Sequence, residues 1–124
     1  MKKIIPLIFT LIGLALLQSC QYDWLEEAPA PPLPEVVSYA ADIQPIWNKS
    51  CNNAGCHSVG GFAPDLTPAN SYNALFAENL VDTASPENSV LYKKVNTGGS
   101  MAFYAKPGDA ELILKWIQDG ALNN

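Results

Sequence analysis

The chain has 124 residues and a formal net charge of −5, with twelve acidic residues against seven lysines and no arginine. A chain of this length holds one small domain. The acidic balance and the lack of arginine exclude nucleic acid as an expected partner, and they give no attraction to anionic lipid head groups.

The first 19 residues have the pattern of an export signal. Lys2 and Lys3 precede an apolar run at residues 4–17, and Cys20 follows the small residue Ser19. A cysteine at this place is typical of a bacterial lipoprotein, whose signal is cleaved just before the cysteine that carries the lipid. The apolar run is shorter than the roughly twenty residues of a membrane span, so a retained anchor is the less favoured alternative. We expect a signal peptide at 1–19 and a lipid anchor at Cys20.

Residues 20–35 are expected to form an extended tether. Four prolines lie within residues 29–34, a density that neither a helix nor a central strand tolerates. The acidic residues at 23–27 are either an ordinary solvated linker or a signal for export to the outer face. Gln21 gives no inner-membrane retention signal of the aspartate type. We therefore expect attachment to the outer membrane, on its periplasmic side or at the cell surface, with the folded domain at 36–124.

The first helix of the domain is predicted to begin near Asp42, a plausible N-cap. Pro45 then falls in the first turn, where its missing N–H costs little. Ile43, Ile46 and Trp47 follow at helical spacing. This predicted helix leads directly into the segment that carries the most recognisable chemistry.

That segment is CNNAGCH at residues 51–57. Two thiols can bind covalently to the vinyl groups of a porphyrin, and a histidine directly after the second thiol can bind its iron. The common form of this motif has two residues between the cysteines; the four found here are small and turn-prone, so they can bulge. A disulfide between Cys51 and Cys56 is the alternative, and zinc would lack a fourth ligand. Haem is favoured because a disulfide does not explain His57, the single histidine of the chain.

A loop rich in glycine and proline comes next, followed by two predicted helices. The carbonyl of Pro64 is a candidate partner for the second ring nitrogen of His57, although Pro64 can equally be a turn residue. A short helix is predicted from Ser71. Another is predicted to open with Ser85 as its cap and Pro86 at its first position.

The last helix is predicted over residues 109–119, capped by Asp109 and ended by Gly120. Its predicted buried stripe consists of Leu112, Ile113, Trp116 and Ile117. Runs with a two-residue period are absent from the sequence, so the domain is expected to be small and all-α, with three to five short helices and long loops. The hydrophobic core of a domain of about 85 residues gives only marginal stability. A covalent haem would hold such a domain together.

Met101 lies in a glycine-rich segment before the last helix and is the only methionine left after signal cleavage. It is the candidate second axial ligand of the iron, with ordinary core filling as the alternative. The haem pocket is further expected to include Trp47, Tyr72, Leu91 and Phe103. Lysines at 49, 93, 94 and 106 either surround the haem edge or are scattered solvated charges.

The chain resembles the small c-type cytochrome domains of exported lipoproteins from Bacteroidetes-like bacteria. The resemblance covers residues 39–122 and rests on YAADIQPIW before Cys51, the CNNAGCH motif, PENSVLY at 86–92, Met101 and LKWIQDGA at 114–121. It implies a class I-like cytochrome c fold, covalent haem c, His57 as one iron ligand and Met101 as the other. Family members usually carry prolines just after the methionine, where this chain has Ala102-Phe103-Tyr104.

The function expected from the sequence is electron transfer through one haem c on a lipid-anchored, exported domain. The protein would be an electron carrier and not an enzyme, a monomer that meets redox partner proteins and reaches the membrane through Cys20. The alternative is a lipoprotein adaptor or binding module without haem, held together by a Cys51–Cys56 disulfide.

Overall fold

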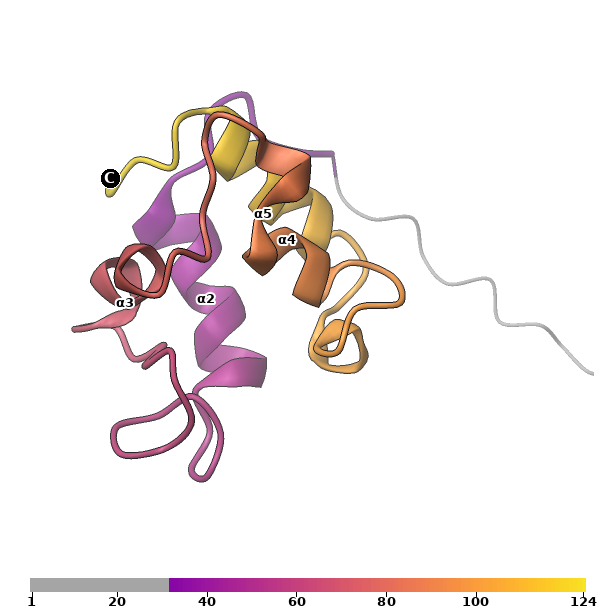
Figure 1. Ribbon diagram of the computed structural model, residues 1–124. Helices are drawn as coiled ribbons and strands as arrows, with labels where there is room; N and C mark the ends of the chain where they lie inside the picture. Colours follow the sequence, from indigo (N-terminus) through magenta and orange to yellow (C-terminus); the bar gives the residue numbers. More distant parts are fainter. Residues whose placement is uncertain (1–31) are drawn as a thin grey trace, which may run out of the picture.

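The computed structural model describes residues 32–124, which form a small all-α domain of four short helices joined by long loops (Figure 1). The helices are α2 (Gln44–Ile46), α3 (Ser71–Ala77), α4 (Val90–Val95) and α5 (Asp109–Gln118), and these residues contain no strand. The short turns η3 (Pro86–Asn88) and η4 (Ala102–Tyr104) precede α4 and α5 respectively. Among the described residues, no helix has the length and apolar character needed to span a membrane. The predicted signal peptide, Cys20 and the first part of the tether lie outside the described residues.

The first helical segment is longer than α2 alone. The wide turns η1 (Tyr39–Ile43) and η2 (Trp47–Cys51) continue α2 at both ends, so the chain is helical from residue 39 to residue 51. Both η1 and η2 contain hydrogen bonds from an N–H to the carbonyl five residues earlier, as from Ile43 to Ser38 and from Asn52 to Trp47. A proline has no N–H and its ring crowds the preceding turn, and wider turns on both sides accommodate Pro45.

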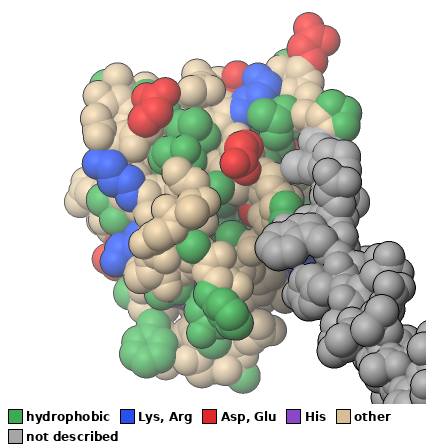
Figure 2. Space-filling model, turned by 90° about the vertical axis from the view of Figure 1, so that its right-hand side faces the viewer, with side chains coloured by type: hydrophobic (Ala, Val, Ile, Leu, Met, Phe, Trp, Pro, Cys, Tyr) green, Lys and Arg blue, Asp and Glu red, His purple; other side chains and the backbone are tan. Residues whose placement is uncertain are grey.

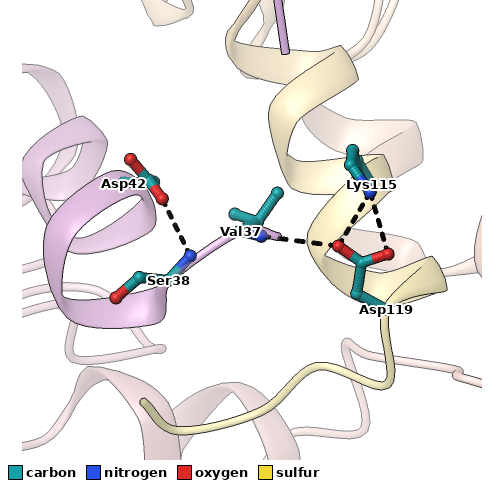
Figure 3. A network of polar contacts seen from close by, with 5 residues as sticks. All are labelled: Val37, Ser38, Asp42, Lys115 and Asp119. Atoms are coloured by element: carbon teal, nitrogen blue, oxygen red, sulfur yellow. Dashed lines mark hydrogen bonds and ion pairs between the residues drawn. The ribbon is translucent and has the colours of Figure 1, made fainter. Parts of the chain in front are cut away.

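The start of this segment differs from the prediction. Ser38, and not Asp42, is the N-cap, and its hydroxyl accepts a hydrogen bond from the Ala41 N–H at 3.2 Å. Asp42 lies in the first turn, and its carboxylate accepts the Ser38 N–H at 2.8 Å (Figure 3). The two side chains thus each accept a free backbone N–H of the first turn, as in a capping box. The helix therefore begins a turn earlier than predicted.

The helix predicted from Ser85 is divided into two pieces by Ser89. Its hydroxyl is buried and bonds both to the N–H of Asp82, at 2.9 Å, and to the carbonyl of Asp82, at 3.2 Å. Because this holds Ser89 in a non-helical conformation, with φ −50° and ψ 131°, η3 ends before it and α4 begins after it. The helix from Ser71 is confirmed as α3.

The last helix, α5, is close to its prediction. Asp109 is its first residue instead of its cap, and Gly120 ends it with a positive φ of 97°. The Ala121 N–H then donates to the Trp116 carbonyl at 2.8 Å, the bond of a Schellman motif. In the predicted stripe Ile113, Trp116 and Ile117 are fully buried and Leu112 is partly buried.

The core lies between the first helical segment, α3, α4 and α5. Its largest fully buried side chains are Trp47 and Trp116, and the ring of Tyr39 lies 5.2 Å from that of Trp116. Asp119 ties the end of α5 to the start of the domain, because its carboxylate accepts from the Val37 N–H and from Lys115 (Figure 3). At the opposite end of the helices lie the loop after Cys51 and the loop that contains η4, and these two loops border the candidate site (Figure 1).

Candidate functional site

A cavity of about 490 Å³ opens between the first helical segment, α4 and the two loops. This volume lies within the roughly 300–1,000 Å³ of most small-molecule and cofactor pockets. The four residues predicted to hold the haem and its iron line it together: Cys51, Cys56, His57 and Met101. The other lining residues are largely apolar: Ile46, Trp47, Ser50, Gly55, Phe62, Ala63, Pro64, Leu66, Leu80, Val90, Leu91, Lys94, Val95, Tyr104, Ala105 and Ile113.

The CNNAGCH loop brings its two ends together despite its extra residues. The His57 N–H donates to the Cys51 carbonyl at 3.0 Å, and the Cys56 N–H donates to the Asn53 carbonyl at 2.9 Å. Gly55 has a positive φ of 81°, which a residue without a side chain adopts at little cost. The four inserted residues therefore form a bulge, and Cys51, Cys56 and His57 all remain on the cavity.

The tautomer of His57 is fixed by two carbonyl groups. Its Nδ1 lies 3.1 Å from the Pro64 oxygen and 3.2 Å from the Phe62 oxygen. Both oxygens can only accept, so Nδ1 carries the proton and a neutral imidazole keeps its lone pair on Nε2. The contact between His57 and Pro64 that the sequence suggested is therefore present. A histidine held in this way is prepared to bind a metal through Nε2.

The two thiols are in different surroundings. Cys51 is partly buried, Cys56 is exposed, and neither forms a disulfide in the described part of the chain. Burial raises the pKa of the Cys51 thiol to about 11, with smaller contributions from the negative charges of Asp109 and Cys56. Cys51 is therefore a neutral thiol near neutral pH.

Met101 is held at the cavity by the backbone of α4. Its N–H donates to the carbonyl of Lys94 at 2.8 Å, which fixes the loop against the end of that helix. Gly99 makes this approach possible, because a Cβ at its position would collide with the carbonyl oxygens of Lys93 and Lys94. The side chain of Met101 is 36% exposed, so it is not a core residue.

The predicted pocket residues divide into two groups. Trp47, Pro64 and Leu91 line the cavity, whereas Tyr72 and Phe103 do not. Tyr72 is partly buried and packs against the core, with its ring 5.1 Å from that of Tyr39. Phe103 is 90% exposed. Aromatic residues fill cores and pockets alike, so the sequence could not separate the two.

A buried hydrogen-bond network supports the wall of the cavity that Trp47 forms. The indole Nε1–H of Trp47 donates to the Tyr39 hydroxyl at 3.3 Å, and that hydroxyl donates to Ser71 at 2.7 Å. Ser71 donates in turn to Gln44, whose amide donates to the Leu66 carbonyl at 3.2 Å. The network joins the first helical segment, α3 and the loop at Leu66 with every group paired, which is the condition under which buried polar groups rigidify a core.

Several lining residues were not foreseen from the sequence. Tyr104 comes from the segment next to Met101, and Phe62 belongs to the loop after the motif. Of the four lysines named as candidates for the haem edge, Lys94 lines the cavity and the other three do not. Val95 follows Leu91 at helical spacing, a signal that could have identified it. Phe62 and Tyr104 lie in irregular segments without such a period, so no pattern indicated them.

Comparisons of the chain with models of protein families, with curated proteins and with solved structures gave no match.

Proposed function

We propose that this protein is an electron carrier that holds a single covalently attached haem c in the cavity between the first helical segment and α4. The observation that carries the proposal is that Cys51, Cys56, His57 and Met101 line one cavity whose other walls are largely apolar, although Cys51 and Met101 lie 50 positions apart in the sequence. These are two thiols, an imidazole and a thioether, the donor set of a c-type haem site with Met/His ligation.

The residues present fit such a group. A porphyrin has large apolar faces, and the cavity offers Trp47, Leu91 and Val95 to them. The protonated Nδ1 of His57 leaves Nε2 able to bind iron. The bulged loop keeps both thiols on the cavity although four residues separate them. This geometry supports haem attachment through the longer motif.

Each residue then has a defined task. Cys51 and Cys56 would hold the haem through thioether bonds, and His57 and Met101 are the candidate axial ligands. A haem held by these residues would supply one-electron chemistry. The carbonyls of Pro64 and Phe62 keep the imidazole in the tautomer that can coordinate, while the apolar walls exclude water and so influence the reduction potential.

A carrier is favoured over a catalyst because Met101 lines the same cavity as His57, so both could serve as iron ligands and would leave no place on the iron for a substrate. The short helices around one cavity are consistent with a class I-like cytochrome c fold. The sequence features of residues 1–35 extend the proposal to a lipoprotein, anchored through Cys20 to the outer membrane, with the tether between the lipid and the domain.

The test is to express the chain with and without a haem-attachment system and to record the reduced pyridine haemochrome spectrum. We expect a c-type spectrum that survives acid and organic extraction. Cys56→Ser should leave at most one thioether bond, and His57→Ala should lose a strong axial ligand. Ser58→Ala, next to the motif, is the matched control and should keep the spectrum unchanged.

The other outcomes decide between the alternatives. A colourless protein in which Cys51 and Cys56 form a disulfide would contradict the proposal and favour the adaptor without haem. Colour that is removed by extraction would show that haem binds in the cavity and that the four-residue spacing prevents its attachment.

A further inference from the structure

The loop from His57 to Leu66 is held largely by its own backbone and little by the core. The Leu66 N–H donates to the His57 carbonyl at 2.8 Å, which closes the loop at its base. Leu66 is the one buried residue of the loop, whereas Val59 and Phe62 are 75% and 72% exposed. The chain after Cys51 forms the lower end of the molecule in Figure 1, and Figure 2 shows hydrophobic side chains exposed at that end. The shape of the loop therefore depends on the contacts that its backbone makes.

The tightest point of the loop is Gly61, where the chain folds back over the motif. The Gly61 N–H donates to the Ser58 carbonyl at 2.8 Å, and the Phe62 N–H donates to the Cys56 carbonyl at 2.8 Å. A Cβ at Gly61 would collide with the same Cys56 carbonyl oxygen. Gly61 has no positive φ, unlike Gly60, so its backbone conformation is open to other residues. This position requires glycine because of the space around it and not because of its torsion angles.

The fold-back places a second hydrogen-bond acceptor beside the His57 ring. Nδ1 of His57 lies 3.1 Å from the Pro64 oxygen and 3.2 Å from the Phe62 oxygen, so one ring proton is shared by two carbonyls in a three-centre bond. The bond from the Phe62 N–H to the Cys56 carbonyl holds Phe62 next to the motif. Acceptors on the free N–H of a coordinating imidazole raise its basicity. Two acceptors in place of one therefore make His57 a stronger electron donor to a metal.

We propose that Gly61 is a positioning residue for His57. By letting the Phe62 carbonyl reach the ring, it makes the imidazole more electron-donating and lowers the reduction potential of a haem bound in the cavity. Gly61 acts through the backbone, because it does not itself line the cavity. The effect on the potential rests on the proposed function, whereas the effect on the imidazole needs no haem.

The first measurement uses the haem-free chain and its single histidine. Long-range proton–nitrogen NMR at pH 8, above the range in which histidines usually titrate, reports which ring nitrogen carries the proton. We expect the Nδ1–H form to dominate, with couplings across the hydrogen bonds to the carbonyl carbons of both Phe62 and Pro64. Gly61→Ala should lower the ratio of the Nδ1–H to the Nε2–H form about threefold or more, because one of two hydrogen bonds to Nδ1–H is lost.

Gly99→Ala is the matched control. A Cβ at Gly99 also collides with backbone carbonyls, those at the end of α4, so the same substitution strains the other loop at the cavity. It should leave the tautomer ratio of His57 unchanged, and equal effects of the two changes would show that strain and not positioning is responsible. Absence of a coupling to the Phe62 carbonyl in the unsubstituted chain would also overturn the proposal, whether or not the Gly61→Ala chain folds.

The second measurement is the reduction potential of the haem-loaded protein. Gly61→Ala should raise the equilibrium constant for one-electron reduction about threefold, or about 28 mV at 59 mV per tenfold, because a weaker donor stabilises the oxidised iron less. Val59→Ala, at an exposed position of the same loop, should leave the potential unchanged. A potential that stays the same or falls in Gly61→Ala would overturn the proposed effect on the iron.

The two measurements also separate this inference from the proposed function. A chain that shows the change in tautomer ratio but takes up no haem would contradict the proposed function alone. A haem-loaded protein whose haem-free form shows no change in tautomer ratio with Gly61→Ala would contradict the role of Gly61 alone.

Discussion

At the scale of single residues, Cys51 and Cys56 have different surroundings although they belong to one motif. Burial keeps Cys51 a neutral thiol, with a pKa of about 11, whereas Cys56 is exposed on the bulged loop. The thiolate is the reactive form of cysteine. The folded chain without haem should therefore present the two thiols to a reagent at very different rates.

We expect iodoacetamide to label Cys51 about ten times more slowly in the folded chain than in urea. A pKa raised by two lowers the thiolate fraction about 100-fold, and the higher nucleophilicity of a basic thiolate restores roughly tenfold. The measurement uses Cys56→Ser in a Cys20→Ser background, made without haem attachment. Cys51→Ser in the same background is the control, in which the exposed Cys56 should react at similar rates folded and unfolded. If the ratio of the labelling rate in urea to that in the folded chain were equal for both variants, the burial of Cys51 would be contradicted.

The same pKa predicts a loss of stability at alkaline pH. The folded Cys51 keeps its proton up to about pH 11, while the unfolded chain loses it near pH 8.5. Stability is therefore unaffected below about pH 8.5 and falls as the pH rises towards 11. Burial also raises the pKa of Tyr39, which adds to this fall. Urea unfolding of the haem-free chain at pH 8 and pH 10 should show a smaller fall in the free energy of unfolding for Cys51→Ser than for the parent chain. Identical falls in the two chains would contradict the raised pKa.

Met101 is the residue whose two interpretations differ most in their measurable consequences. As a surface residue that is 36% exposed, it contributes little to the core, and Met101→Ala should change the stability of the haem-free chain by less than about 1 kcal/mol. As an axial ligand it would raise the reduction potential. We expect Met101→Ala to lower the potential of the haem-loaded protein and to abolish the sulfur-to-iron absorption band in the near infrared. A large loss of stability with an unchanged potential would show that Met101 is a packing residue.

At the scale of elements, the sequence predicted the helices well and their ends less well. The apolar spacing in α5 and the stop at Gly120 were correct because they depend on neighbouring residues alone. The early start at Ser38 and the break at Ser89 were missed, because both depend on hydrogen bonds of side chains whose partners the apolar pattern does not identify. The cavity residues on irregular loops, such as Phe62 and Tyr104, could not be predicted because those segments have no apolar period.

The loop from α4 to η4 gives the test at this scale. Gly99→Ala places a Cβ against the carbonyl oxygens of Lys93 and Lys94, and relieving this collision requires the loop to move. We expect a loss of about 1–3 kcal/mol in unfolding free energy, the usual range for overpacking, together with weaker iron–sulfur absorption in the haem-loaded protein. Ser100→Ala, at the next and exposed position, is the control and should have neither effect. An unchanged spectrum for Gly99→Ala would show that this contact does not position Met101.

At the scale of the whole molecule, the cavity and the core share one wall. Trp47 lines the cavity on one side, and its indole bonds to the buried hydroxyl of Tyr39 on the other. The Tyr39 hydroxyl also bonds to Ser71 of α3, and Ser71 is fully buried. The shape of the cavity therefore depends on a polar network within the core.

Tyr39→Phe removes the centre of this network without changing the volume of the core. The Trp47 N–H then loses its buried acceptor, and an unpaired buried group costs about 1–3 kcal/mol. We expect urea unfolding to show a loss of this size, and the haem spectrum to change with it because Trp47 is freed to move. Tyr92→Phe is the matched control: its hydroxyl accepts only from the Asn96 amide, in a partly buried pair, so the loss should be below about 0.5 kcal/mol. If the two variants lose equal stability, the network does not support the cavity wall, and the apolar contacts of Trp47 alone hold it in place.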